Sequence, residues 1–264
     1  MPPATATQDA PLVSLRGIGK SFPNGVRALA GLNIDIRPGE FVALLGPSGC
    51  GKSTALRIIA GLTEPSEGVV EWDKAAASRS EGRIGYVFQE PTLMPWASVF
   101  ENAELPLKLN RMRAAGRMER VEAALDRVGL SAFRNAYPRE LSGGMRMRVS
   151  LARALVTEPQ ILLMDEPFAA LDEITRFKLN DDLLQTWDAL RTTIVFVTHS
   201  VFESVYLANR VLVMAARPGR ISTEVAIDAP YPRGRSFRTS AEYAALCWRA
   251  SEALAVAMAV GGPP

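Results

Sequence analysis

The chain has 264 residues, of which 48% are hydrophobic and 22% charged, and its formal net charge is +2. This balance excludes a disordered or fibrous chain, and it gives no reason to expect a nucleic-acid partner. Cys50 and Cys247 lie far apart and no metal-binding spacing of Cys or His occurs, so a reducing, cytoplasmic setting is expected. The longest apolar stretches fall short of the roughly 20 residues that span a bilayer, so any membrane association would run through a partner.

The first quarter of the chain is predicted to pass from antiparallel strands to a strand-loop-helix unit. Residues 12–15 and 32–36 alternate apolar and other side chains on either side of a turn at residues 23–25. This pattern predicts antiparallel strands. Residues 41–45 then form a continuous apolar run, typical of a strand buried on both faces, and a helical segment follows over residues 52–60.

The remaining elements indicate an α/β protein with a parallel sheet and a helical subdomain. Residues 98–158 show helical periodicity without a buried strand, and an extension over residues 215–264 combines a short strand region with a terminal helix. One domain is therefore expected over residues 12–264, after a flexible tail at residues 1–11. Three more apolar runs predict buried parallel strands, with helices between them, at residues 160–164, 193–197 and 210–214.

Two clusters of arginine stand out from the mixed charge pattern. The first comprises Arg111, Arg113, Arg117 and Arg120, and the second comprises Arg233, Arg235 and Arg238. Either cluster could face phosphate groups or acidic lipid headgroups. A solvated helix face or tail is the favoured interpretation, because glutamates interleave the first cluster.

The strand predicted at residues 41–45 leads into the phosphate-binding pattern GxxxxGK[ST], followed by a helix as the chemistry requires. Glycines let backbone N–H groups turn around a phosphate, Lys52 would neutralise the β- and γ-phosphates of ATP, and Ser53 would supply an oxygen to Mg²⁺. An accidental glycine-rich turn is the alternative, which the strand-helix context disfavours. The nucleotide-binding candidates are Gly46, Pro47, Ser48, Gly49, Cys50, Gly51, Lys52, Ser53 and Thr54.

Two acids and the single histidine follow predicted strands at the same edge of the sheet. Asp165, a candidate metal ligand, and Glu166 end the run at residues 160–164, where phosphate-bound Mg²⁺ would lie. Glu166 could accept the proton of an attacking water or orient that water. His199 could hydrogen-bond a phosphate oxygen and the water. Taken alone, the acids could serve solubility and the histidine could be a surface residue.

The sequence Leu-Ser-Gly-Gly-Met at residues 141–145 precedes a predicted helix. Ser142 can cap that helix, and Gly143 and Gly144 would allow another body to approach closely. Considered alone, ordinary helix capping is the favoured interpretation.

Taken together and in this order, these motifs resemble the ATP-binding cassette (ABC) family of transporters over residues 12–214. The resemblance implies a phosphate-loop ATPase core of ABC type that uses ATP and Mg²⁺. It also implies that Gln89 contacts Mg²⁺ or water, that Asp172 lies in the loop after the acidic strand, and that Phe22 stacks on adenine. A core aromatic is the alternative for Phe22.

The same resemblance implies a head-to-tail pair of subunits, in which Ser142 and Gly144 of one copy cover the γ-phosphate held by Lys52 of the other. Hydrolysis would depend on Lys52, Gln89, Glu166 and His199. The closing motion would pass through Gln89 to residues 90–102 and on to integral membrane subunits at the cytoplasmic face of the membrane.

Residues 88–107, 198–206 and 217–220 resemble importers of the nitrate, sulfonate and taurine type, which receive solute indirectly from a binding protein. The same pattern occurs in uptake systems for pyrimidine-like vitamin precursors, so the sequence leaves the solute open. Met147 stands where the family often has glutamine, and Ala169 stands where many members have serine. These two departures leave open the rate of ATP hydrolysis and the contacts within the dimer.

Three other classes of protein use related machinery. A soluble ABC ATPase acting on DNA or ribosomes would usually carry two cassettes or a long coiled-coil insertion. An exporter half would commonly be fused to membrane helices. A small-molecule kinase shares the phosphate loop but has no need of the sequence at residues 141–145, so the importer subunit is the favoured hypothesis.

Overall fold

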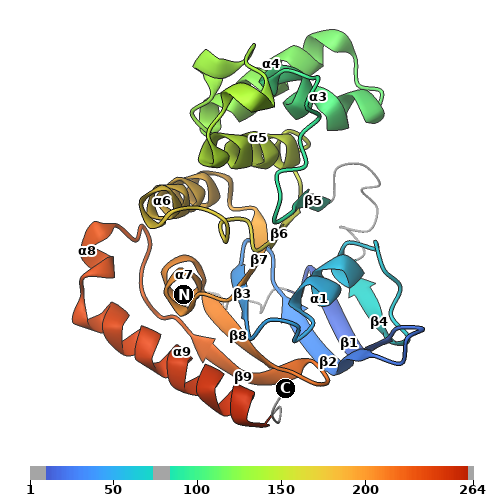
Figure 1. Ribbon diagram of the computed structural model, residues 1–264, viewed down its shortest axis with the longest axis vertical. Helices are drawn as coiled ribbons and strands as arrows, with labels where there is room; N and C mark the ends of the chain where they lie inside the picture. The colour runs from blue at the N-terminus through green and yellow to red at the C-terminus, as the bar shows by residue number, and fades with distance from the viewer. Residues whose placement is uncertain (1–9, 74–83, 261–264) are drawn as a thin grey trace, which may run out of the picture.

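The computed structural model describes residues 10–73 and 84–260, in which a small antiparallel sheet adjoins a larger, mainly parallel sheet (Figure 1). The tail expected at residues 1–11 lies outside the described residues except for its last two positions. The small sheet has the order β2-β1-β4, which confirms the predicted antiparallel opening. Its edge strand β4 is mostly exposed, and the sequence pattern does not predict it. The strands are β1 (Val13–Ser21), β2 (Arg27–Ile36) and β4 (Glu67–Trp72).

The larger sheet has six strands in the order β5-β6-β7-β3-β8-β9. Neighbours from β5 to β8 are parallel, as predicted. The last strand pairs antiparallel with β8, because a short turn joins the two. The strands are β3 (Phe41–Leu45), β5 (Ile84–Val87), β6 (Ile161–Asp165), β7 (Thr193–Thr198), β8 (Arg210–Ala215) and β9 (Arg220–Ala226).

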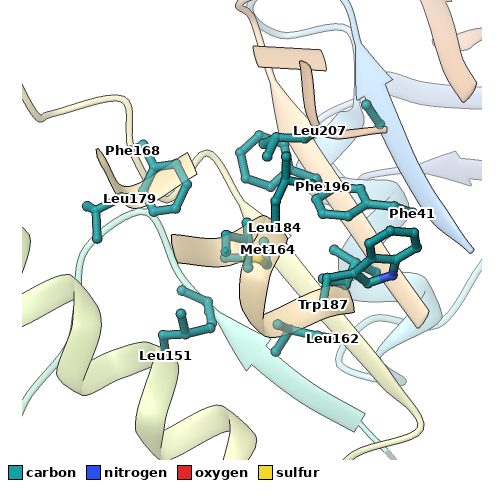
Figure 2. Packing of buried hydrophobic residues seen from close by; sticks show 14 of the residues in the cluster. Phe41, Leu151, Leu162, Met164, Phe168, Leu179, Leu184, Trp187, Phe196 and Leu207 are labelled. Atoms are coloured by element: carbon teal, nitrogen blue, oxygen red, sulfur yellow. The ribbon is translucent and has the colours of Figure 1, made fainter. Parts of the chain in front are cut away.

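Strand β3 illustrates why the central strands are continuously apolar. Phe41, Ala43 and Leu45 point into one hydrophobic cluster, whereas the two residues between them point into the cluster on the other face. On the first face, Phe41 packs edge-to-face against Trp187 with ring centroids 5.9 Å apart, and Phe196 lies beside it (Figure 2). Each large side chain buried in this way contributes roughly 1.5–3 kcal/mol, so the loop after Leu45 starts from a firmly held strand.

Helices cover both faces of this sheet, and the predicted helical subdomain stands apart at one end (Figure 1). Its helices α3, α4 and α5 fall within residues 98–158, where only helices and turns occur. They confirm the predicted helical character of this stretch. The helices that precede the C-terminal extension are α1 (Lys52–Ile59), α3 (Val99–Leu109), α4 (Ala114–Arg127), α5 (Gly143–Leu155), α6 (Glu173–Leu190) and α7 (Val201–Leu207), with short 3₁₀ turns at Ser131–Phe133 and Pro138–Glu140.

The C-terminal extension folds back beside α7 and the edge of the larger sheet. It contains β9, the short α8 (Arg235–Arg238) and the long α9 (Ala241–Val260), which packs against β8, β9 and α7 (Figure 1). The expectation that the second arginine cluster is solvated is wrong for Arg233, whose exposure is 5%. Across residues 10–73 and 84–260, each helix is too short or too polar to cross a bilayer.

Candidate functional site

The predicted phosphate loop joins β3 to α1 through a left-handed turn. Gly51 is the N-cap of α1 with a φ of 95°, and a Cβ added there would lie 2.7 Å from Leu29 Cδ2 and 2.9 Å from the Ala28 carbonyl oxygen. Glycine is therefore required both by the backbone conformation and by the space. The first turn of α1 carries no acidic residue and its N-cap has no side-chain hydrogen bond, so its positive end is open to an anion.

Lys52 is held inside the loop, with its side chain only 4% exposed. Its ammonium donates hydrogen bonds to the carbonyl oxygens of Gly46 at 2.8 Å and Pro47 at 3.0 Å. The same nitrogen lies 3.5 Å from Glu166 Oε1. A buried cation is costly unless it is paired, and here loop dipoles together with one carboxylate compensate it.

Asp165 is the last residue of β6 and lies beside α1. Ser53 Oγ donates a hydrogen bond to Asp165 Oδ1 at 2.7 Å, and the Tyr86 hydroxyl lies 3.4 Å from the other carboxylate oxygen. Burial, with the charge of Asp165 as the second cause, raises the pKa of Tyr86, so its hydroxyl stays protonated as a donor. The sequence motifs do not point to Tyr86, because nothing in its local pattern indicates that β5 lies next to β6.

Glu166 links the phosphate loop to the histidine. Its Oε1 faces Lys52, and its Oε2 lies 2.9 Å from His199 Nδ1. Glu166 has a φ of 45°, an uncommon conformation for a residue other than glycine, and its N–H donates to the Val197 carbonyl at 3.0 Å. The backbone of β7 therefore fixes a strained turn that turns the carboxylate towards both partners.

The oxygen donors at this site fit Mg²⁺. Ser53 Oγ and the Asp165 carboxylate are already in contact, and Gln89 lines the same cleft. Groups of three or more His, Cys, Asp and Glu side chains placed to hold a metal ion are absent from the part of the chain that the structure describes. A few protein oxygens suit Mg²⁺, which is usually bound by one or two carboxylates together with substrate phosphates and water.

Predicted residues from distant parts of the sequence meet in one cleft of about 500 Å³, called here the phosphate-loop cleft. Gly46, Pro47 and Cys50 belong to the loop but do not line the cleft. The Cys50 side chain is fully buried in the core, where burial raises the pKa of its thiol. The predicted residues that line the cleft are Ser48, Gly49, Gly51, Lys52, Ser53, Thr54, Gln89 and Glu166.

Four residues that the motifs do not predict also line the phosphate-loop cleft, namely Val26, Arg27, Ala28 and Arg217. They come from the start of β2 and from the turn between β8 and β9. No sequence signal links them to the loop, because the packing of β2 against α1 and of the β8–β9 hairpin against β2 brings them there. Arg27, which pairs with Glu67 at 3.1 Å, and Arg217 bring two guanidinium groups to the lining of the cleft.

Besides Gly46, Pro47 and Cys50, five predicted nucleotide residues do not line the phosphate-loop cleft: Phe22, Ser142, Gly143, Gly144 and Asp172. Phe22 is 38% exposed, which rules out the alternative of a core aromatic. Ser142 caps α5 and Asp172 caps α6, by accepting hydrogen bonds from Met145 N and Thr175 N. The space beside Gly144 is taken by the chain's own Thr175, 2.7 Å from where a Cβ would stand. The single chain therefore separates these groups from Lys52.

Comparison with known proteins identifies the family. The model of the ABC transporter family matches residues 29–169. An ABC transporter ATP-binding protein of Methanocaldococcus jannaschii is 48% identical, covering 83% of this chain and 82% of the relative. An aliphatic sulfonates import ATP-binding protein of Bacillus cereus is 42% identical, covering 85% and 89%.

Solved structures agree. A dimeric post-hydrolysis ATP-binding cassette bound to ADP and phosphate superimposes with a TM-score of 0.69 and 34% identity, over 83% of this chain and all of that one. The α/β core with its helical subdomain is therefore the fold of ABC ATPase cassettes, as predicted. The chain belongs to the ABC transporter family.

Proposed function

We propose that the chain is the subunit of an ABC importer that binds and hydrolyses ATP. The observation that carries this proposal is the double contact of Glu166, which lies within 3.5 Å of Lys52 Nζ on one side and 2.9 Å from His199 Nδ1 on the other. A carboxylate placed between the phosphate-binding lysine and a histidine is in position to act on a water that attacks the γ-phosphate.

Each residue of the site has a separate task in this mechanism. The N–H groups at the start of α1 and the ammonium of Lys52 bind and neutralise the phosphates. Glu166 orients the attacking water and accepts its proton, while His199 holds the carboxylate by donating from Nδ1. When both ring nitrogens of His199 carry a proton, Nε2 can also donate to a phosphate oxygen. Ser53, Asp165 and Gln89 would hold Mg²⁺, which when bound supplies Lewis-acid stabilisation of the phosphate charge.

A second copy of the chain completes the site. Ser142, Gly143 and Gly144 lie outside the phosphate-loop cleft of their own chain, and the first-turn N–H groups of α5 have no intrahelical partner. Head-to-tail pairing places these groups, with Asp172, over the γ-phosphate bound by the other copy, and Phe22 contacts the adenine. The dimeric state of the solved relative bound to ADP and phosphate supports this arrangement.

The transported solute is a small anion of the sulfonate, nitrate or taurine class. Similarity to the Bacillus cereus protein named for aliphatic sulfonate import supports this assignment. The subunit acts at the cytoplasmic face of the membrane, attached to integral permease subunits through the surface after Gln89, and receives solute indirectly from a binding protein. Uptake of radiolabelled sulfonate by a deletion strain, compared with uptake of nitrate and of a pyrimidine, would identify the solute.

The catalytic assignment predicts the effect of Glu166→Gln. ATP should still bind, because the phosphate loop is unchanged, but phosphate release should fall by at least about 100-fold, since amide nitrogen and oxygen cannot accept the proton. The trapped pair should appear as an ATP-dependent dimer in light scattering coupled to size-exclusion chromatography. Asp165→Asn serves as the comparison, because it should abolish hydrolysis by weakening the binding of Mg²⁺. Wild-type turnover by Glu166→Gln would contradict the role given to Glu166.

A further inference from the structure

The helix that follows His199 is held at both ends, and its C-terminal end is held by the C-terminal extension. Helix α7 begins at Val201, two residues after His199, and packs against β3, β7 and α9. With seven residues it has little stability of its own, because isolated helices shorter than about 12 residues are marginal in water. Its position is therefore set by what surrounds it.

At its N-terminal end, α7 is tied to both neighbours of His199. Glu203, in the first turn, accepts a hydrogen bond from Thr198 Oγ1 at 2.6 Å. The N–H of Ser200 donates to the same hydroxyl at 3.0 Å, and Ser200 Oγ accepts from Glu203 N at 3.3 Å. The backbone on either side of His199 must therefore follow any displacement of this turn.

At its C-terminal end, α7 contacts the buried guanidinium of Arg233. Nη1 of Arg233 donates to the carbonyl oxygens of Val205, Tyr206 and Ala208 at 3.0, 3.0 and 2.9 Å. These are carbonyls of the last turn, which an α-helix leaves without internal partners, and they carry the negative end of the helix dipole. Among the described residues, no ion pair with a carboxylate is formed by Arg233, so backbone carbonyls and the ring faces of Tyr231 and Phe237, 4.1 and 5.4 Å away, compensate its charge.

The second terminal nitrogen of the Arg233 guanidinium, Nη2, connects α7 to the extension itself. Nη2 donates to the carbonyl oxygens of Ile227 at 3.3 Å and Ala229 at 3.0 Å, just after β9. Two tyrosines of the extension add to this attachment: the hydroxyl of Tyr231 donates to Leu207 O at 2.7 Å, and the hydroxyl of Tyr243 donates to Phe202 O at 2.9 Å. Donors from residues 231–243 thus reach carbonyls along the whole of α7.

We propose that Arg233 is a positioning residue for ATP hydrolysis, through which the C-terminal extension fixes α7 and so the contact between His199 and Glu166. The connection is continuous: Arg233 holds the last turn of α7, Glu203 in its first turn holds Thr198 and Ser200, and His199 lies between those two. The inference rests on the proposed role of His199. It gives the extension a function in the chemical step, although Arg233 touches no part of the phosphate-loop cleft.

The test is a double-mutant cycle in the full chain, measured by single-turnover phosphate release so that slow residual hydrolysis is quantified. Arg233→Met retains length and loses the donors, so the rate of the chemical step should fall between about 10- and 100-fold, because small displacements of catalytic groups have effects of that size. The KM for ATP should stay within about twofold, since no phosphate contact changes. In a His199→Ala chain the same substitution should change the rate by less than about twofold. Arg233→Lys should recover part of the activity.

Two further variants separate positioning from general destabilisation. Val121→Ala removes methyl groups from a fully buried residue of α4, remote from α7, and should lower the Tm while leaving the rate unchanged at a temperature where the chain stays folded. Tyr231→Phe removes one hydroxyl bond to α7 and should lower the rate less than Arg233→Met, again only when His199 is present. This variant keeps the test decisive if Arg233→Met does not fold.

An equal loss of rate in the wild-type and His199→Ala backgrounds would overturn the inference, as would full activity of both Arg233→Met and Tyr231→Phe. Failure of the proposed function has a different signature. In that case the wild-type chain would not release phosphate from ATP, or His199→Ala would be fully active before any change to Arg233.

Discussion

The N-termini of α1 and α5 offer the same chemistry in opposite settings. Both helices begin beside glycine and present unpaired N–H groups with the positive end of a helix dipole. The N-cap of α1 is Gly51, which has no side chain to cap the helix and precedes the buried Lys52. The N-cap of α5 is the exposed Ser142, whose hydroxyl accepts from Met145 N at 3.3 Å.

The difference lies in what the rest of the chain adds to each terminus. At α1 the fold brings Glu166 and His199 to the buried Lys52, so the ammonium and the carboxylate that the proposed mechanism uses lie together. At α5 the chain places Thr175 behind Gly144, and the charged group beside Gly143 is the guanidinium of Arg146, which already donates to the Leu141 carbonyl at 2.7 Å. In the proposed mechanism the first terminus binds phosphates within its own chain, whereas the second contacts a nucleotide only in a pair of subunits.

Gly51→Ala should have the largest effect on this comparison, because it combines backbone strain with steric conflict. A left-handed alanine costs about 1–2 kcal/mol, and the new Cβ would press on Leu29 and the Ala28 carbonyl, adding about 1–3 kcal/mol. Denaturant unfolding should show the sum of the two losses, and titration should show loss of ATP binding. Gly49→Ala is the matched control, since its φ is 76° but a Cβ there meets no protein atom within 4 Å. Equal losses from both variants would show that strain alone matters.

Ser142→Asp should have an intermediate effect and should act only on the pair of subunits. Aspartate caps a helix as well as serine does, so the folded chain should be no less stable. Binding of ATP to a single chain should be unchanged, but a negative charge beside the γ-phosphate of the other copy should lower steady-state hydrolysis at least about 10-fold. Ser142→Asn, which caps without a charge, is the matched control. Equal activity of the Asp and Asn variants would place this terminus away from the phosphates.

The elements around the phosphate loop could be predicted because their signals are local. The run at residues 41–45 is apolar at every position since both faces of β3 are covered, and the loop pattern follows within the same dozen residues. By contrast β4 carries no such signal, because none of its side chains is fully buried, whereas the other edge strand of the same sheet, β2, alternates buried and exposed side chains. Predictability here follows the burial of side chains on at least one face.

The environment of Arg233 could not be predicted, for the opposite reason. Its partners are backbone carbonyls up to 28 residues earlier in the chain, and every residue type has a carbonyl, so no side-chain pattern marks them. Proximity to Arg235 and Arg238 suggested solvent instead. The position of Arg27 and Arg217 at the phosphate-loop cleft could not be predicted for the same reason, since the packing of the small sheet and the β8–β9 hairpin brings them there.

Asp172→Asn should have the smallest effect, and it extends the comparison to α6, where an acid occupies the capping position. Asp172 Oδ1 accepts from Thr175 N at 2.9 Å, and this bond lowers the pKa of the carboxyl below its ordinary 3.8. A lowered folded-state pKa means that the charge stabilises the fold above 3.8, and that this stabilisation is lost as the pH falls through the folded-state value. Asparagine keeps the cap without the charge, so the Tm of the wild type should be slightly higher than that of Asp172→Asn at neutral pH. This difference in Tm should shrink as the pH falls from about 5 towards 2, and thermal unfolding across this range would measure it.

A margin that persisted at low pH would mean that the carboxylate of Asp172 contributes nothing through its charge. The expected loss instead distinguishes two kinds of helix start in this chain. Helix α6 neutralises its own positive end with a fixed acid. Helix α1 carries no acid in its first turn, which leaves its positive end for a phosphate that the chain does not supply.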